Sequence, residues 1–179
     1  MFKAYILKPV YYTSENMLDE KDLQLLELIQ ENCKVSLKEL ARKVNLPVTT
    51  THARLKKLEK MGLIKNYQAI LDAKKLGFGV TAFILISFSY RPGSGKGQIS
   101  QREIARKIAS FPEVQEVHII TGDWDMIVKV KVKDVNELGR FVVDRLRTVE
   151  GVDKTLTCVV LDTAKESLAI PVDRARIVS

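Results

Sequence analysis

Residues 36–62 constrain the fold of this chain more than any other stretch, because they hold two helical patterns joined by an obligatory turn. Ser36 and Glu39 have the spacing of a capping box, in which each side chain accepts a hydrogen bond from the backbone amide of the other residue. Apolar residues then recur at helical spacing up to Asn-Leu-Pro at 45–47, where the residue before proline disfavours helical backbone. A second helix is therefore predicted after this turn, over about 48–61.

A further helical pattern precedes this pair, and a strand-like pattern follows it. Asp19 is the predicted cap of the earlier helix. The residues predicted to face the core from that helix are Leu23, Leu26 and Ile29. Gly62 is predicted to end the last helix in the left-handed conformation, and 64–71 is predicted to be a strand. Together these elements describe a winged helix-turn-helix domain over 18–65 and a hinge strand or linker over 66–78.

Basic residues concentrate within 36–66, which holds eight basic and two acidic side chains against a net charge of +7 for the whole chain. The major groove of B-DNA accommodates one α-helix, and the second helix of such a pair supplies the side chains that reach base edges. Short residues near the start of the 48–61 helix allow close approach to bases, and longer cations, including Lys60, can reach phosphates. The candidate DNA-contacting residues are Thr49, Thr50, His52, Ala53, Arg54, Lys56 and Lys57. A helical module with a solvated basic face is the alternative, and the charge concentration favours double-stranded DNA as a partner.

The second half of the chain changes from helical to strand periodicity. The predicted strands span 80–90, 114–120, 126–132 and 155–161, and the predicted helices span about 101–110 and a segment from Asp134 onward. This β-α-β-β-α-β order predicts a ferredoxin-like domain over 79–170, with both helices on one face of a four-stranded sheet. The other face must meet water or a partner. The overall class is α+β, with a 171–179 tail and a 1–17 extension that is either an arm pairing with a partner subunit or a loosely ordered tail.

Several functional classes find no support in the sequence. Cys33 and Cys158 lie far apart with no histidine near either, which disfavours a disulfide or a zinc site and predicts two buried thiols. The glycine-rich loop over 91–98 lacks two residues of a phosphate-binding loop, whose places are taken by Tyr90 and Gly97. No catalytic arrangement has usable spacing, so we expect no enzyme activity, no metal and no cofactor.

No apolar run approaches the ~18–20 residues that cross a bilayer. The N-terminal stretch also lacks the features of a signal peptide. We therefore expect a cytoplasmic protein without a membrane partner.

The Gly-Asp-Trp-Asp sequence at 122–125 is open to two interpretations. It has the composition of a hairpin turn. Alternatively, its two carboxylates at the rim of a sheet could hold the ammonium group of an amino acid, with hydroxyl contacts from Thr155 and Thr157, which alternate along the last strand.

Several short motifs follow one another along the chain: Leu18-Asp19-Glu20-Lys21-Asp22, Ser36-x-x-Glu39-Leu40-Ala41, Arg54-Leu55-x-x-Leu58-Glu59-x-x-Gly62-Leu63-Ile64, Tyr67-x-Ala69-Ile70-Leu71, Leu76-Gly77, Gly122-Asp123-Trp124-Asp125 and Thr155-x-Thr157-x-Val159-Val160-Leu161. In this order and spacing they resemble the Lrp/AsnC (feast/famine) family of transcription regulators over about residues 17–170. The sequence departs from the family pattern at Pro47, where a capping serine is usual, and at Thr51, where an apolar residue is usual. The 1–17 extension and the 91–100 loop also exceed the usual pattern.

The resemblance implies a bacterial or archaeal regulator whose first domain binds operator DNA and whose second domain dimerises and assembles into tetramers or octamers. It further implies that an amino acid or related metabolite binds between dimers, near the turn and the last strand. The effector-binding residues carried over by position are Gly122, Asp123, Asp125, Thr155 and Thr157, with Cys158 and Val159 lining the site.

The function predicted from the sequence is therefore a sequence-specific DNA-binding transcription regulator. Its oligomerisation or DNA affinity is expected to respond to a small ligand, an amino acid by preference. Two alternatives stay open at this point: an architectural nucleoid protein that binds DNA without a ligand, and an amino-acid-sensing module of a metabolic enzyme. The basic helix argues against the second.

Overall fold

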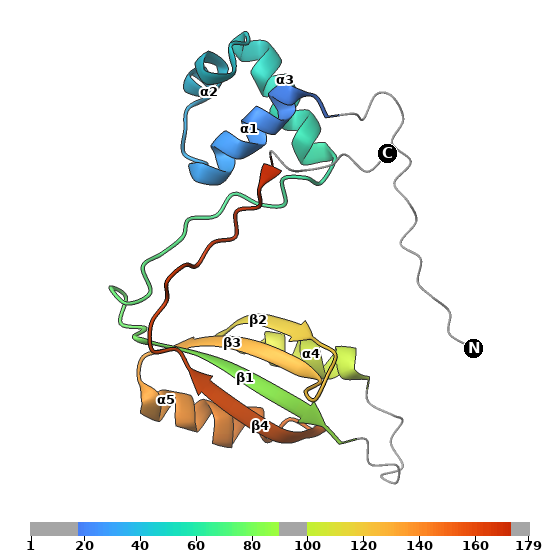
Figure 1. Cartoon of the computed structure of the whole chain (residues 1–179), viewed down its shortest axis with the longest axis vertical. Coiled ribbons are helices and arrows are strands. Elements are labelled where there is room, and N and C mark those ends of the chain that lie inside the picture. The colour runs from blue at the N-terminus through green and yellow to red at the C-terminus, as the bar shows by residue number, and fades with distance from the viewer. Residues whose placement is uncertain (1–17, 90–99, 173–179) are drawn as a thin grey trace, which may run out of the picture. The chain divides into compact units, whose positions relative to one another are not determined.

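The computed structural model describes residues 18–89 and 100–172 and divides the chain into two compact units (Figure 1). Unit 1 holds the described residues up to Ile70 together with those from Ser167, and unit 2 is Leu71–Glu166. The predictions for the 1–17 extension, for the loop at 91–98 and for most of the C-terminal tail lie outside the described residues. Within these ranges, no helix combines the length and the apolar character required to span a bilayer.

Unit 1 contains α1 (Glu20–Glu31), α2 (Leu37–Val44) and α3 (Val48–Lys60), which are the three predicted helices. Their shared core consists of Leu25, Leu40, Val44 and Leu58. The predicted core-facing residues of α1 were incomplete, because Leu25 is fully buried whereas Leu23, Leu26 and Ile29 are only partly buried. The inward stripe of α1 begins with Asp22, which is buried, and a charged residue at that position conceals the apolar pattern.

The helices begin after the predicted cap residues, although at α2 only the half of the predicted capping box that Ser36 supplies is seen. Asp19 and Asp22 form a complete capping box at α1, and the Ser36 hydroxyl accepts a hydrogen bond from the Glu39 amide at 3.2 Å. Asn45 takes the left-handed conformation between α2 and α3, at φ 53°. Thr51 of α3 is fully buried, and its hydroxyl donates to the Pro47 carbonyl oxygen at 3.0 Å. This hydrogen bond explains how a threonine is accommodated among apolar neighbours.

The predicted strand over 64–71 is wrong. Residues 64–72 form no regular element, and Ile70 is 88% exposed. A strand needs a neighbouring strand to pair its backbone groups, and none of the strands in the described ranges pairs with this segment. Gly62 does end the preceding helix with a positive φ of 73°, as predicted.

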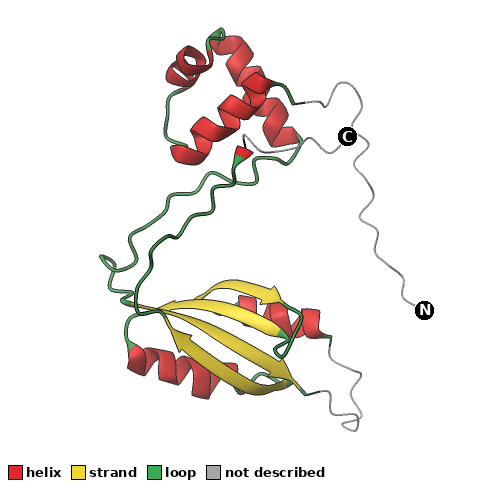
Figure 2. Cartoon of the chain, viewed as in Figure 1, coloured by secondary structure: helices red, strands yellow, loops and turns green. Residues whose placement is uncertain are grey.

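Unit 2 has the predicted β-α-β-β-α-β order (Figure 2). Its elements are β1 (Val80–Phe88), α4 (Gln101–Ala109), β2 (Val114–Ile119), β3 (Met126–Val132), α5 (Val135–Arg140) with its π-helical continuation η2 (Phe141–Leu146), and β4 (Val152–Val159). The four strands are antiparallel in the order β2-β3-β1-β4, which is the ferredoxin-like arrangement.

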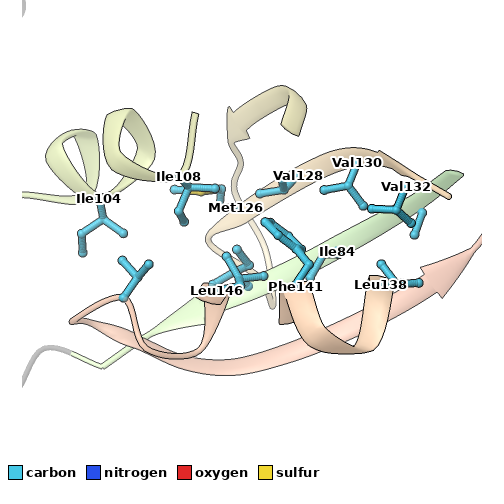
Figure 3. Packing of buried hydrophobic residues seen from close by; sticks show 13 residues of the cluster. Ile84, Ile104, Ile108, Met126, Val128, Val130, Val132, Leu138, Phe141 and Leu146 are labelled. Carbon is cyan, nitrogen blue, oxygen red and sulfur yellow. The ribbon is translucent and has the colours of Figure 1, made fainter. Parts of the chain in front are cut away.

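One face of the sheet carries the core of unit 2. Side chains of α4 and of the α5–η2 helix, among them Ile108 and Phe141, pack onto alternate residues of β1 and β3, such as Ile84 and Val128 (Figure 3). Both helices therefore cover the same face, as predicted.

The opposite face is covered by no helix within the described residues of unit 2, and we call it the open face. Its central side chains belong to Phe83, Leu85, Ile127, Leu156 and Cys158, which alternate with the buried positions of their strands. Leu156 is 46% exposed and Cys158 is also exposed. The prediction of buried thiols was wrong, because Cys158 lies on this open face and Cys33 lies in the exposed turn between α1 and α2.

Candidate nucleic-acid interface and effector site

The outer face of α3 brings together most of the residues predicted to contact DNA. Thr49, Ala53, Lys56 and Lys60 are spaced by four, three and four residues, so they lie along one side of the helix, and all four are exposed. His52 is exposed beside them, and Thr50 is partly buried at the margin. The opposite side of α3 faces the core through Thr51 and Leu58. The side of α3 that faces away from the core thus combines short residues with lysines.

An acidic residue lies at the edge of this outer face. The Lys56 ammonium is 2.7 Å from a Glu59 carboxylate oxygen, and the Tyr67 hydroxyl donates to the other oxygen at 3.1 Å. These hydrogen bonds hold the pKa of the Glu59 carboxyl below its ordinary value. Burial and the Glu59 carboxylate raise the pKa of Tyr67. Since an exposed ion pair adds little stability, Lys56 can exchange Glu59 for a phosphate.

Arg54 and Lys57 do not share the outer face. Arg54 binds two carboxylates of the α1 region: its Nη1 lies 2.6 Å from Asp19 Oδ2 and 2.8 Å from Asp22 Oδ1. The Lys57 ammonium is 4.0 Å from the other oxygen of Asp22. Arg54 therefore has carboxylate partners within the domain, and its predicted contact with DNA stays a prediction. The sequence could not show this, since Asp19 lies 35 residues away in the chain.

Sequence reasoning also left out exposed bases of α2. Lys38 and Arg42 are exposed on α2, the first helix of the helix-turn-helix pair. In this motif the first helix crosses the DNA backbone. The same charge count that marked 36–66 contained these residues, but the candidates were taken from α3 alone.

In unit 2, Asp125 of the predicted effector site holds structural elements together. Its Oδ2 accepts a hydrogen bond from the Phe88 amide at 2.9 Å, and its Oδ1 accepts one from Gln101 Nε2 at 3.2 Å. The Asp125 amide donates to the Ile86 carbonyl at 3.0 Å. This carboxylate therefore ties the end of β1 to the start of α4. In contrast, Gly122, with φ 121°, and Asp123 are exposed in the turn before it.

Thr155 and Thr157 lie on the edge strand β4. They pair with Ile86 and Ile84 of β1, so both side chains point to the face that carries the core, and both are partly buried. Ile86 pairs with Met126 on its other side, which places Asp125 and Thr155 at the same end of the sheet with β1 between them. Asp125 and Thr155 thus lie at the same end of the sheet on either side of β1, and Thr157 lies two residues further along β4.

Two cavities in unit 2 lie away from these residues. One, of about 120 Å³, is lined by residues of α4 and of the segment around Val149, and the other, of about 250 Å³, by residues such as Lys131 and Asp162. Neither is lined by any of the predicted effector residues. Among the residues that the structure describes, no three His, Cys, Asp or Glu side chains are grouped so that they could hold a metal ion.

Comparison with known proteins gives the same two-part division. A family model described as the Lrp/AsnC ligand binding domain matches residues 81–170, and one described as a winged helix-turn-helix DNA-binding domain matches residues 18–65. An uncharacterised HTH-type transcriptional regulator of Pyrococcus abyssi is 43% identical over 85% of this chain and 98% of its own length. HTH-type transcriptional regulator FL11 of Pyrococcus furiosus is 37% identical over 87% of this chain and 97% of its own.

Solved structures show the same similarity. The complex of a Neisseria meningitidis transcriptional regulator with L-Met aligns with a TM-score of 0.80 and 28% identity, over 88% of this chain and 98% of that one. An AsnC family regulator of Agrobacterium tumefaciens aligns with a TM-score of 0.78 and 26% identity, over 87% and 98% of the two chains.

Proposed function

Since this chain belongs to the Lrp/AsnC family of transcription regulators, we propose that it recognises specific double-stranded DNA through the outer face of α3 and that an amino acid bound to unit 2 modulates this recognition. The observation that carries the DNA proposal is the single exposed stripe of Thr49, Ala53, Lys56 and Lys60. Short side chains occupy its N-terminal half and lysines its C-terminal half. The two halves suit different parts of the duplex.

Base reading is assigned to the N-terminal half of the stripe. Thr49 offers a hydroxyl and a methyl group, Ala53 offers a methyl group, and His52 offers ring nitrogens, which suit the donor, acceptor and thymine-methyl pattern of the major groove. Phosphate contacts are assigned to Lys56 and Lys60, because ammonium groups on long stems reach the backbone on the sides of the groove. Sequence preference and affinity then depend on different residues of one helix.

A salt titration tests this interface. We define the salt slope as the magnitude of the negative slope of log K against log salt, counted per bound subunit. On an operator selected from a random-sequence library, Lys56→Ala and Lys60→Ala should each lower the salt slope by about one unit, because each removes one phosphate contact per subunit. Lys107→Ala, which removes an exposed lysine of α4 in unit 2, is the matched control and should leave the slope unchanged. Unchanged slopes in both α3 variants would refute the assignment. Footprints spread evenly over genomic fragments would favour the architectural alternative.

The ligand proposal rests on the Lrp/AsnC ligand-binding domain and on the exposed turn at 122–125. A similar regulator of Neisseria meningitidis is an L-Met complex, which supports an amino acid as the ligand class. Asp123 is assigned to the ammonium group, the hydroxyls of Thr155 and Thr157 to further polar contacts, and Asp125 to holding the turn in place. Calorimetry of the intact protein against the twenty amino acids tests this. We expect a heat of binding with at least one amino acid, and we expect the Asp123→Asn variant to lose it. The absence of binding heat with all twenty amino acids would overturn the proposal.

The open face is assigned to a homodimer interface. It presents Phe83, Leu85, Ile127 and Leu156 on the side of the sheet that no described helix of unit 2 covers, and pairing two such faces would remove this apolar surface from water. A two-fold dimer carries two copies of α3, which suits an operator with two half-sites. Further assembly of such dimers into tetramers or octamers belongs to the same proposal.

A further inference from the structure

Asp22 is a carboxylate buried in the core of a small helical domain. It is 1% exposed and lies on the inward stripe of α1, three residues before the fully buried Leu25. Removing a charge from water is unfavourable unless the charge is paired and hydrogen-bonded. Its partners therefore indicate why an acid is retained at a position that would suit an apolar residue.

The charged partners of Asp22 come from α3. Arg54 Nη1 is 2.8 Å from Asp22 Oδ1 and 2.6 Å from Asp19 Oδ2, so one guanidinium nitrogen bridges two carboxylates. The Lys57 ammonium is 4.0 Å from Asp22 Oδ2. The side chain of Arg54 is only 26% exposed as a result. The hydrogen bonds that Arg54 donates to Asp22 and Asp19 raise the pKa of its guanidinium further, so its charge is fixed.

We propose that Asp19 and Asp22 withhold Arg54 from DNA and, through it, fix α3 against α1. Arg54 is then a positioning residue of the reading helix and not a DNA contact. A guanidinium is a planar fork of N–H donors that can pair with two oxygens of a carboxylate or of a phosphate. The two acids occupy this group before DNA arrives. This inference rests on the proposed role of α3 in DNA binding.

The consequence for recognition follows from the kinds of contact that DNA offers. Each additional phosphate contact raises the affinity for every sequence, without reading bases. An arginine released beside α3 would therefore strengthen non-specific binding more than specific binding. Asp19 and Asp22 therefore keep the ratio of specific to non-specific DNA affinity high.

The first test replaces Arg54 by methionine, which keeps an unbranched stem and removes the charge. The slope of log K against log salt should stay at the wild-type value, while the melting temperature falls because Asp22 loses its nearest cation. A slope lowered by about one unit would overturn the proposal, because it would show that Arg54 contacts a phosphate. Far-UV circular dichroism at the binding temperature identifies a variant that has simply unfolded.

The second test removes the acids and keeps their shapes. In Asp19→Asn/Asp22→Asn, asparagine still caps the helix, whereas the guanidinium loses both anionic partners. The salt slope should rise by about one unit, and the ratio of operator to random-sequence affinity should fall several-fold. A merely structural role would weaken binding without raising the slope. Glu20→Gln is the matched control: it removes a charge from the same first turn, and its contact in the structure is with Gln24.

The control variants distinguish the possible results. An equal rise in Glu20→Gln would show simple charge removal and overturn the inference, as would an unchanged slope in the double variant. If Lys56→Ala and Arg54→Met both lower the slope, the α3 interface stands and only the withholding of Arg54 fails. If neither Lys56→Ala nor Lys60→Ala changes the slope, the proposed interface fails, and this inference fails with it.

Discussion

The outer face of α3 and the turn at 122–125 are both candidate sites. A single chain brings together the residues of the first site more fully than those of the second. The stripe from Thr49 to Lys60 lies on a single helix, so helical periodicity alone brings its members together. The predicted effector residues come from a turn and an edge strand with β1 between them. One of them, Asp125, is already occupied by the Phe88 amide and by Gln101.

From this difference we expect the two candidate sites to depend on a second chain to different extents. The α3 stripe is exposed, with short side chains in its N-terminal half and lysines in its C-terminal half. The turn at 122–125 offers Gly122 and Asp123 on the surface, and neither cavity described in unit 2 is lined by them. We therefore expect DNA contact to be a property of the single chain and ligand binding to be a property of the assembly.

The largest expected effect comes from breaking that assembly. Leu85 lies on the open face between Ile127 and Leu156, so Leu85→Glu should give a monomer in analytical ultracentrifugation. Operator affinity should fall by about 10²–10⁴-fold, because two half-sites are no longer bound by one molecule. Amino-acid binding should be lost, while weak non-specific DNA binding remains. Gln115→Glu introduces the same charge at an exposed position of β2 and serves as the control. A monomeric Leu85→Glu variant that still binds amino acids would contradict the expectation that ligand binding requires the assembly.

The next largest effect is a difference in stability between variants of Asp123 and Asp125, the two acids of the turn. Asp125→Ala leaves the Phe88 amide without its acceptor and should lower the free energy of unfolding by roughly 1–3 kcal/mol. Asp123→Ala, at an exposed position, should change the free energy of unfolding by less than about 0.5 kcal/mol. Urea denaturation of both variants measures the difference. Equal changes in the free energy of unfolding would contradict the structural role of Asp125 and would favour a ligand contact for it.

The same contrast explains what could be predicted from the sequence. The β-α-β-β-α-β order and the helix boundaries follow from local periodicity and caps, as at Ser36 and Gly62. Partners distant in sequence could not be predicted, so the pairing of Arg54 with Asp19 and Asp22 was not foreseen. Leu25 was missed because buried Asp22 interrupts the apolar stripe. The strand over 64–71 was predicted from composition, although a strand also requires a neighbour.

A smaller effect distinguishes the two sides of α3. Thr51→Val removes the hydroxyl that donates to the Pro47 carbonyl and should lower the free energy of unfolding by about 1 kcal/mol, with operator preference unchanged. Thr49→Val, on the outer face, should instead leave the free energy of unfolding nearly unchanged and alter the preferred operator sequence. Thermal denaturation and a selection from a random-sequence library measure the two effects. A change of operator preference in Thr51→Val alone would contradict the assignment of the outer face.

The smallest effect is a pH dependence in unit 1. Partial burial acts to raise the pKa of the Asp19 carboxyl, but hydrogen bonds from the Asp22 amide and from Arg54 outweigh it, so the pKa lies below its ordinary value. A carboxyl whose pKa is lower in the folded than in the unfolded state stabilises the fold above the unfolded pKa, about 3.9, and this contribution is lost as the pH falls through the folded pKa. Asn at position 19 keeps the cap but cannot titrate. The difference in urea midpoint between wild type and Asp19→Asn should therefore stay constant from neutral pH to about pH 5 and shrink below about pH 4. A difference that grows on acidification would show that the Asp19–Arg54 pair does not stabilise the domain, and it would remove the physical basis for a fixed α3.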